Sequence, residues 1–179
     1  GSCDDSLSIA QKYCIQHTEC QVIAQENRGV SAARNAAITA AKGTYILPVD
    51  ADDKIADTFI EKAVKAIQED NTIRVVGCRC WLFGVMDKEW QLPKFSHSLL
   101  ARKNMIPATA LYRKVDWESC GGYCEEEIYR EDWDFWLSMM ELGGEYIRLD
   151  EVGLYYRVLP YSRRSKAKSQ KKTIVDAIN

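Results

Sequence analysis

An apolar segment that ends in a run of carboxylates constrains the fold of this chain more than any other feature. Residues 45–49 read YILPV, and the acidic segment Asp50-Ala51-Asp52-Asp53 follows directly. Such a run is typical of a buried strand, although Pro48 cannot donate a hydrogen bond to a sheet. Ligands of parallel α/β sheets bind at the carboxyl ends of the strands. The segment therefore predicts an α/β domain with a polar site beside residues 50–53.

The spacing of the acidic segment suggests what that site binds. Asp50 and Asp52 are two residues apart, so an extended backbone can turn both carboxylates toward one point. Clustered carboxylates repel each other unless a cation neutralises them, and oxygen ligands select hard ions such as Mg²⁺ or Mn²⁺. The alternative is a solvated loop in which Asp53 caps the next helix.

The rest of the chain alternates between helical and strand-like patterns, as expected of one α/β domain. We expect helices over residues 5–17, 30–42, 59–67 and 131–142, and a turn or short helix over 115–119. We expect strands over residues 21–25, 45–49, 73–83 (one or two strands), 108–112, 145–149 and 153–158. Gly43 and Gly143-Gly144 stand where a left-handed residue ends a helix, and Asp57 where a side chain caps one. Residues 87–104 read as a polar loop region.

Composition narrows the class of protein. The chain has 179 residues, of which 46% are hydrophobic and 28% charged, and its formal net charge is −2. That balance excludes disorder and argues against a nucleic-acid partner held by overall charge. No apolar run reaches the roughly 18 residues of a membrane span, and the first residues lack signal-peptide character. We expect a soluble, cytoplasmic, single-domain protein.

The chain has seven cysteines, and we interpret them as reduced thiols. Cys78 and Cys80 are two apart on an expected strand, so both thiols point to the same face. A metal or redox pair there is the alternative, although no second pair supports it.

Several segments in order resemble family 2 glycosyltransferases. The stretches 26–38, 41–46 and 50–53 are similar to the sugar-nucleotide-binding half of that family. The stretches 113–123 and 130–137 are similar to its acceptor-side segment, and Tyr155-Tyr156-Arg157-Val158 to its closing strand. The resemblance implies an α/β fold of the Rossmann-like GT-A type, a nucleotide-diphospho-sugar transferase fold. It divides the domain into a donor half (1–56), an acceptor half (57–160) and a basic tail (161–179).

The resemblance also implies a role for each site residue. A sugar would pass from a nucleoside diphosphate sugar to an acceptor hydroxyl, usually by a single inverting displacement. Asp52 would bind Mn²⁺ or Mg²⁺, with Asp50 helping or contacting the ribose. Arg34 and Glu131 would contribute to nucleotide-sugar binding, and Asp132 would be the general base.

Each of these residues also has a purely structural interpretation. Arg34 can form a surface salt bridge on an Ala-rich helix. Glu131 and Asp132 can simply occupy the first turn of a helix, where acidic side chains are favourable. By their helical spacing, Trp133 and Trp136 are interpreted as core residues rather than sugar platforms.

Two features depart from the family pattern. Leu159 stands where the family has a histidine that contacts the diphosphate or metal. The family also opens with a strand, a helix and a second strand that have no counterpart here, so the fold is expected to be N-terminally truncated. Unpaired sheet edges invite pairing with another chain, so we expect a homo-oligomer.

The leading hypothesis is a glycosyltransferase of cell-surface polysaccharide synthesis, with a saccharide or lipid-linked acceptor. The basic tail is either solvated or in contact with diphosphate or anionic lipid, which would place the protein at the inner face of the membrane. The alternative is a truncated, inactive remnant that only self-associates or binds a protein partner. A nucleotidyltransferase is a third possibility, although no Gly-rich phosphate loop supports it.

Overall fold

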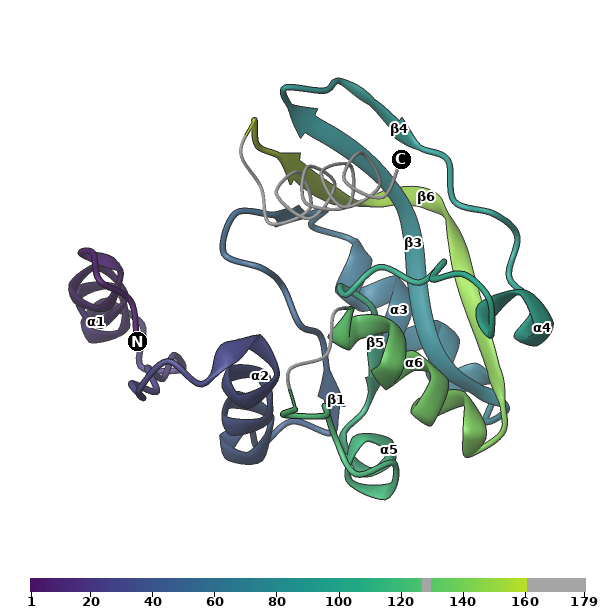
Figure 1. Cartoon of the computed structure of the whole chain (residues 1–179), viewed down its shortest axis with the longest axis horizontal. Helices are drawn as coiled ribbons and strands as arrows, with labels where there is room; N and C mark the ends of the chain where they lie inside the picture. Colours follow the sequence, from purple (N-terminus) through teal and green to yellow (C-terminus); the bar gives the residue numbers. More distant parts are fainter. Residues whose placement is uncertain (127–129, 161–179) are drawn as a thin grey trace, which may run out of the picture.

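The protein is described by a computed structural model that covers residues 1–126 and 130–160. Its core is a mixed six-stranded sheet in the order β1-β5-β3-β6-β2, with β4 paired to the free part of β3 (Figure 1). The strands are β1 (Tyr45–Ile46), β2 (Lys54–Ile55), β3 (Ile73–Gly84), β4 (Lys88–Trp90), β5 (Leu111–Arg113) and β6 (Glu145–Val158). The helices are α1 (Ser6–Gln16), α2 (Gly29–Ala40), α3 (Phe59–Glu69), α4 (His97–Leu100), α5 (Lys114–Ser119) and α6 (Glu131–Glu141).

Two long strands form the spine of the sheet. β3 and β6 run parallel from the pair Ile73–Glu145 to the pair Gly84–Val158, and the other strand pairs are antiparallel. The register shifts around Arg79, where β6 accommodates extra residues. The two closing strands expected over 145–149 and 153–158 are therefore one strand with a bulge, because the interruption bends the pairing without ending it.

The two faces of the sheet are covered by different helices. On α3, Phe59, Ala63 and Ile67 are buried against a cluster that includes the thiols of Cys78 and Cys80, which share a face as predicted. On α6, Phe135, Trp136 and Met139 are buried against the opposite cluster around Tyr112 and Tyr146. The core position predicted for Trp136 is confirmed, and Trp133 packs at the margin of the same cluster.

Helix ends follow the sequence signals only in part. Gly143 and Gly144 have positive φ angles of 79° and 95° just after α6, as expected of glycines that end a helix. The expectation for Gly43 was wrong, because α2 already ends at Ala41, whose extended backbone donates to Ala37 O and Ile38 O. The cap expected of Asp57 was also wrong, since Thr58 is the N-cap of α3.

The N-terminal part lies apart from the body of the domain (Figure 1). None of the residues of α1 is buried, and the apolar side chains of Ile9, Tyr13 and Ile15 are exposed. The strand expected over residues 21–25 is irregular, because no neighbouring strand in the described chain offers it a hydrogen-bond partner. The strand expected over 45–49 shortens to β1, which pairs only with β5 before Leu47 and Pro48 leave the sheet.

Candidate active site

The acidic segment forms a tight turn after β1. Asp53 donates its backbone N–H to Asp50 O at 3.0 Å, which brings the three carboxylates of residues 50–53 into one short loop. The Asp52 side chain is exposed, while Asp50 and Asp53 are half-buried. The loop leads directly into β2, which pairs with β6 at Lys54–Tyr155. The sheet therefore fixes the C-terminal end of this segment directly.

Arg34 joins three separate parts of the chain. Its guanidinium lies 2.9 Å from Asp50 Oδ1 and 3.3 Å from Glu131 Oε1, and 5.4 Å from the centre of the Tyr123 ring. Only 11% of the Arg34 side chain is exposed. The structure thus brings together three of the residues that the sequence places in a sugar-nucleotide site. A mere surface salt bridge does not describe an arginine buried to this extent.

Asp132 follows Glu131 in the first turn of α6. Asn104 Nδ2 donates to Asp132 Oδ2 at 2.7 Å. Burial is the largest effect on Asp132 and raises the pKa of its carboxyl, and the charge of Glu131 raises it further. The hydrogen bonds from Asn104 and from the Trp133 backbone, and the charge of Arg34, act in the opposite direction. The result is a carboxylate with increased proton affinity, which suits a general base.

The backbone before Asp132 adopts an unusual conformation. Arg130 has a φ of 79°, the only positive φ among non-glycine residues of the described chain. This left-handed residue precedes α6, and Trp133 and Asp134 donate backbone hydrogen bonds to its carbonyl. Its guanidinium lies 5.6 Å from the Trp133 ring centre. Non-glycine residues adopt this conformation at a cost, and such residues cluster at functional sites.

Asn35 holds the loop after α5 against α2. Its side chain donates to Tyr123 O at 2.8 Å and accepts from Tyr123 N at 2.9 Å. The Tyr123 ring is buried and stacks on Phe135, with ring centres 4.1 Å apart. This pair of bonds places the Tyr123 ring under Arg34. No local sequence pattern identifies Asn35, because its side chain bonds to a backbone that is distant in the sequence.

A second connection ties the acidic segment to the end of β6. Arg157 donates its backbone N–H to Asp53 Oδ1 at 2.8 Å and its Nε to Asp52 O at 2.9 Å. Its guanidinium lies 4.6 Å from the Phe83 ring centre. Burial raises the pKa of Asp53 to about 6, and the charges of Asp50 and Asp52 add to this effect. Two residues beyond Arg157, Leu159 is 44% exposed.

The acidic segment offers a limited set of metal ligands. No group of three His, Cys, Asp or Glu side chains within residues 1–126 and 130–160 is arranged to hold a metal ion. Asp50 already binds Arg34, which leaves Asp52 as the most available carboxylate. A divalent ion held by one or two carboxylates and completed by substrate phosphates fits this donor set. A site built from protein ligands alone does not.

Two hollows open on the described surface. The first, the α2–β1 hollow, has a volume of about 560 Å³ and is lined by Arg34, Asp50 and the apolar side chains of Ala37, Tyr45 and Leu47, among others. Its size lies in the range of small-molecule sites. It is the hollow that reaches the predicted donor residues.

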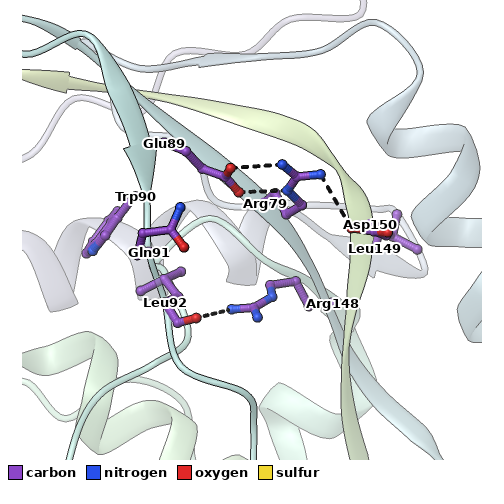
Figure 2. Close-up of a pocket in the computed structure, with 8 residues that line it drawn as sticks. All are labelled: Arg79, Glu89, Trp90, Gln91, Leu92, Arg148, Leu149 and Asp150. Carbon is purple, nitrogen blue, oxygen red and sulfur yellow. Dashed lines mark hydrogen bonds and ion pairs between the residues drawn. The ribbon is translucent and has the colours of Figure 1, made fainter.

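The second hollow lies on β3, β4 and β6, with a volume of about 430 Å³. Figure 2 shows its charged side chains, which we name the Arg79 cluster: Arg79, Glu89, Arg148 and Asp150. Arg79 donates to both Glu89 oxygens, at 2.6 and 2.8 Å, and lies 3.4 Å from Asp150. Arg148 donates to the carbonyls of Leu92 and Pro93. Arg79 is therefore paired with the carboxylates of the cluster, and Arg148 is bound by backbone carbonyls.

The chain is similar to curated proteins over most of its length. The sequence model described as glycosyl transferase family 2 matches residues 1–135. The uncharacterized glycosyltransferase EpsJ of Bacillus subtilis is 31% identical over 179 residues, covering 90% of this chain and 52% of that protein. Chondroitin synthase of Escherichia coli is 25% identical over 150 residues, covering 80% of this chain and 21% of that protein. The chain thus spans about half of EpsJ and a smaller part of chondroitin synthase.

Solved structures share the fold. TarS of S. aureus, residues 1–349 in complex with UDP-GlcNAc, has a TM-score of 0.73 and 20% identity, covering 92% of this chain and 49% of that one. The mannosyltransferase PcManGT of Pyrobaculum calidifontis, in complex with GDP-Man and Mn²⁺, has a TM-score of 0.66 and 18% identity, covering 93% and 48%. The expected α/β GT-A fold class is confirmed. Because the family match spans more than half of the chain and the fold agrees, the chain belongs to family 2 of the glycosyltransferases.

Proposed function

We propose that this chain carries donor and catalytic residues of an enzyme that transfers a sugar from a nucleoside diphosphate sugar to an acceptor hydroxyl. The observation that carries the proposal is the bridge from Arg34 to Asp50 and Glu131, beside Asp132 and the α2–β1 hollow. Related folds are solved with UDP-GlcNAc and with GDP-Man and Mn²⁺, which supports a nucleotide-sugar donor. Residues 1–56 contribute to the donor half and residues 57–160 to the acceptor half.

Each residue has a defined part in the proposed reaction. Asp52, with Asp50, would hold Mn²⁺ or Mg²⁺, which would supply positive charge to offset the charge of the leaving diphosphate. Arg34 orients Asp50 and Glu131 beside the donor. Asp132 takes the proton from the acceptor hydroxyl as its oxygen attacks the anomeric carbon. A single displacement of this kind inverts the configuration at that carbon.

The acceptor and the setting are also part of the proposal. Chondroitin synthase and hyaluronan synthase among the relatives support a saccharide acceptor and a role in cell-surface polysaccharide synthesis, with a lipid-linked acceptor as the alternative. Within residues 1–126 and 130–160, no helix is long and apolar enough to cross a bilayer. The basic tail proposed for contact with the inner face of the cytoplasmic membrane lies outside the described residues.

Self-association is proposed from the exposed edge of the sheet. β1 has one strand neighbour in the described chain, and α1 exposes Ile9, Tyr13 and Ile15. These unpartnered surfaces support an oligomer. They also support the second candidate, an inactive remnant that only associates, together with Leu159 in place of the family histidine. Light scattering at high protein concentration tests the oligomer, and a monomer mass contradicts it.

Nucleotide binding tests the catalytic proposal directly. We would measure the melting temperature of the chain with UDP, GDP, CDP and dTDP, each with and without Mn²⁺. A ligand at a hundredfold excess over its dissociation constant stabilises the folded state by about 2.7 kcal/mol. We expect a Mn²⁺-dependent increase for one nucleotide that is lost in Asp52→Ala. An absence of any increase favours the inactive remnant.

A further inference from the structure

The first turn of α6 is tied to the segment 97–106 by two side-chain bonds. Trp133 Nε1 donates to Leu100 O at 2.7 Å, and Asn104 Nδ2 donates to Asp132 Oδ2 at 2.7 Å. Leu100, Met105 and Ile106 on this segment are each 1% exposed, so the segment is anchored in the core on both sides of Asn104. Asn104 therefore approaches Asp132 from a fixed backbone rather than from a free loop.

The orientation of the Asn104 amide follows from its own backbone. Asn104 Oδ1 accepts the backbone N–H of Ile106 at 3.2 Å. Reversing the amide would set its NH₂ group against that N–H, and its oxygen against the Asp132 carboxylate. Both contacts would be repulsive for an ionised Asp132. The NH₂ group is thus directed at Asp132 by the turn at residues 104–106.

We propose that Asn104 is a positioning residue that holds Oδ2 of Asp132 and leaves Oδ1 to receive the proton of the acceptor hydroxyl. This inference rests on the proposed role of Asp132 as the general base. One fixed carboxylate oxygen sets the rotation of the side chain, so the other oxygen keeps one direction. Neither Asn104 nor its segment carries a family motif, and residues 87–104 read only as a loop from sequence.

The bond also affects how readily Asp132 binds a proton. Glu131, Arg34 and the Tyr123 hydroxyl are titratable groups that interact with this carboxyl. Arg34 and Glu131 pair with each other, whereas the side-chain hydrogen bonds of Asn104 within the described residues go to Asp132 and Ile106. Removing the Asn104 amide therefore changes one interaction of Asp132. A hydrogen bond donated to an ionised carboxylate favours the ionised form, so its loss should increase the proton affinity of Asp132 about tenfold.

The test measures the Asp132 titration directly. The aspartate carboxyl carbons of the whole chain are labelled with ¹³C, and the Asp132 signal is assigned by its absence in Asp132→Asn. We expect Asn104→Leu to raise the pKa of Asp132, corresponding to about a tenfold higher proton affinity. Asn104→Asp keeps an oxygen for the Ile106 N–H and replaces the donor by an acceptor, so it should raise the pKa further and serves if the leucine variant does not fold.

The matched control is Trp133→Phe, which removes the other bond between the same two segments. A purely structural role for Asn104 predicts similar titration changes in Trp133→Phe and in the Asn104 variants, and that result would overturn the proposal. Unchanged Asp132 titration in both Asn104 variants would overturn it as well. The proposal requires a change in the Asn104 variants alone.

A second experiment, a turnover assay, tests this inference separately from the proposed function. Release of UDP from UDP-GlcNAc and of GDP from GDP-mannose is followed between pH 5 and pH 9 with Mn²⁺. For the donor that the wild type turns over, we expect Asn104→Leu to lower kcat about tenfold with little change in KM and to move the acid limb to higher pH. A wild type without turnover contradicts the proposed function, while the carboxyl titration still decides the role of Asn104.

Discussion

Two charged regions of this protein contain the same kinds of side chains but differ in the ratio of arginines to carboxylates. The Arg79 cluster has two arginines and two carboxylates, and Arg79 binds both oxygens of Glu89. The donor-side cluster, defined as Arg34, Asp50, Asp52, Glu131 and Asp132, has one arginine for four carboxylates. Among the ion pairs of the described residues, Asp52 and Asp132 have none.

The pKa values of carboxylates in the two regions are also shifted in opposite directions. The hydrogen bonds from Arg79 hold the pKa of Glu89 below its ordinary value. In the donor-side cluster, burial and neighbouring negative charge raise the pKa of Asp132, as they do that of Asp53, which lies beside the cluster. A balanced cluster stabilises its own ions, whereas a cluster with surplus carboxylates needs a cation or a proton from outside. The surplus, rather than the number of charges, is what distinguishes a candidate site from a structural network.

The largest expected effect comes from removing a surplus carboxylate. Asp52→Asn should lower sugar transfer roughly a thousandfold, because the metal loses its most available ligand and no longer offsets the leaving-group charge. Turnover of the nucleotide sugar with Mn²⁺ measures this. The control is Asp150→Asn, which removes an exposed carboxylate from the Arg79 cluster and should leave turnover unchanged. Equal losses in the two variants would contradict the comparison.

The next effect concerns the single arginine of the donor-side cluster. Arg34→Met should lower the free energy of unfolding by about 2–3 kcal/mol, since it leaves Asp50 and Glu131 without their buried partner. Urea unfolding at pH 7 measures the change. Arg79→Met, at an arginine that is 40% exposed, should lower the free energy of unfolding much less, because solvent screens its ion pairs. If Arg79→Met costs as much as Arg34→Met, burial does not separate the two regions.

A smaller effect is expected from the connection to β6. Arg157→Leu removes the bond to Asp52 O and should weaken Mn²⁺ binding in the presence of UDP about tenfold, because the loop that carries Asp52 is less well fixed. Electron paramagnetic resonance of free Mn²⁺ measures the affinity. Lys54→Leu is the matched control, since Lys54 also lies over the Phe83 ring, at 5.5 Å, but its side chain makes no hydrogen bond to the acidic loop within the described residues. A similar loss in both variants would assign the effect to Phe83.

The smallest effect appears in stability against pH. A carboxyl whose pKa is raised by folding contributes stability that is fully present below its unfolded pKa and is lost as the pH rises through the folded value. Asp132→Asn should therefore be more stable than the wild type at pH 7, with the difference vanishing near pH 4. Glu89→Gln should be less stable than the wild type at pH 7, because Arg79 lowers the Glu89 pKa. Unfolding at both pH values checks the opposite signs.

The elements that sequence predicted well are those that pack on the spine of the sheet. α3 and α6 carry apolar side chains at helical spacing, and the sheet buries them as that spacing implies. Residues 21–25 have strand-like composition but no strand beside them, and composition alone does not make a strand. The break expected near Asp150 is a bulge, because β3 continues to pair with β6 on both sides of it.

The candidate site was likewise predictable from the sequence only in part. The segments around Arg34, Asp50 and Glu131 were assigned to one region by resemblance, and the structure brings these side chains within hydrogen-bonding distance. Their roles stay predictions until ligand binding is measured. Asn104 acts through a contact with a residue far away in the sequence, so no local pattern could identify it. Arg157 lies in the segment that resembles the closing strand of the family, but its bond to Asp52 O could not be predicted from that segment. The fold had to be known first.

The left-handed backbone at Arg130 has a consequence for sequence variation. A residue with a side chain is disfavoured there by roughly 1 kcal/mol relative to glycine, so neutral drift should favour glycine at this position. A guanidinium that persists against this bias among close relatives would be under selection for what it contacts, beginning with the Trp133 ring. A glycine that replaces it freely would show that only the turn before Glu131 and Asp132 matters. The residues that close relatives have at position 130 would thus show whether the guanidinium is needed or only the left-handed turn.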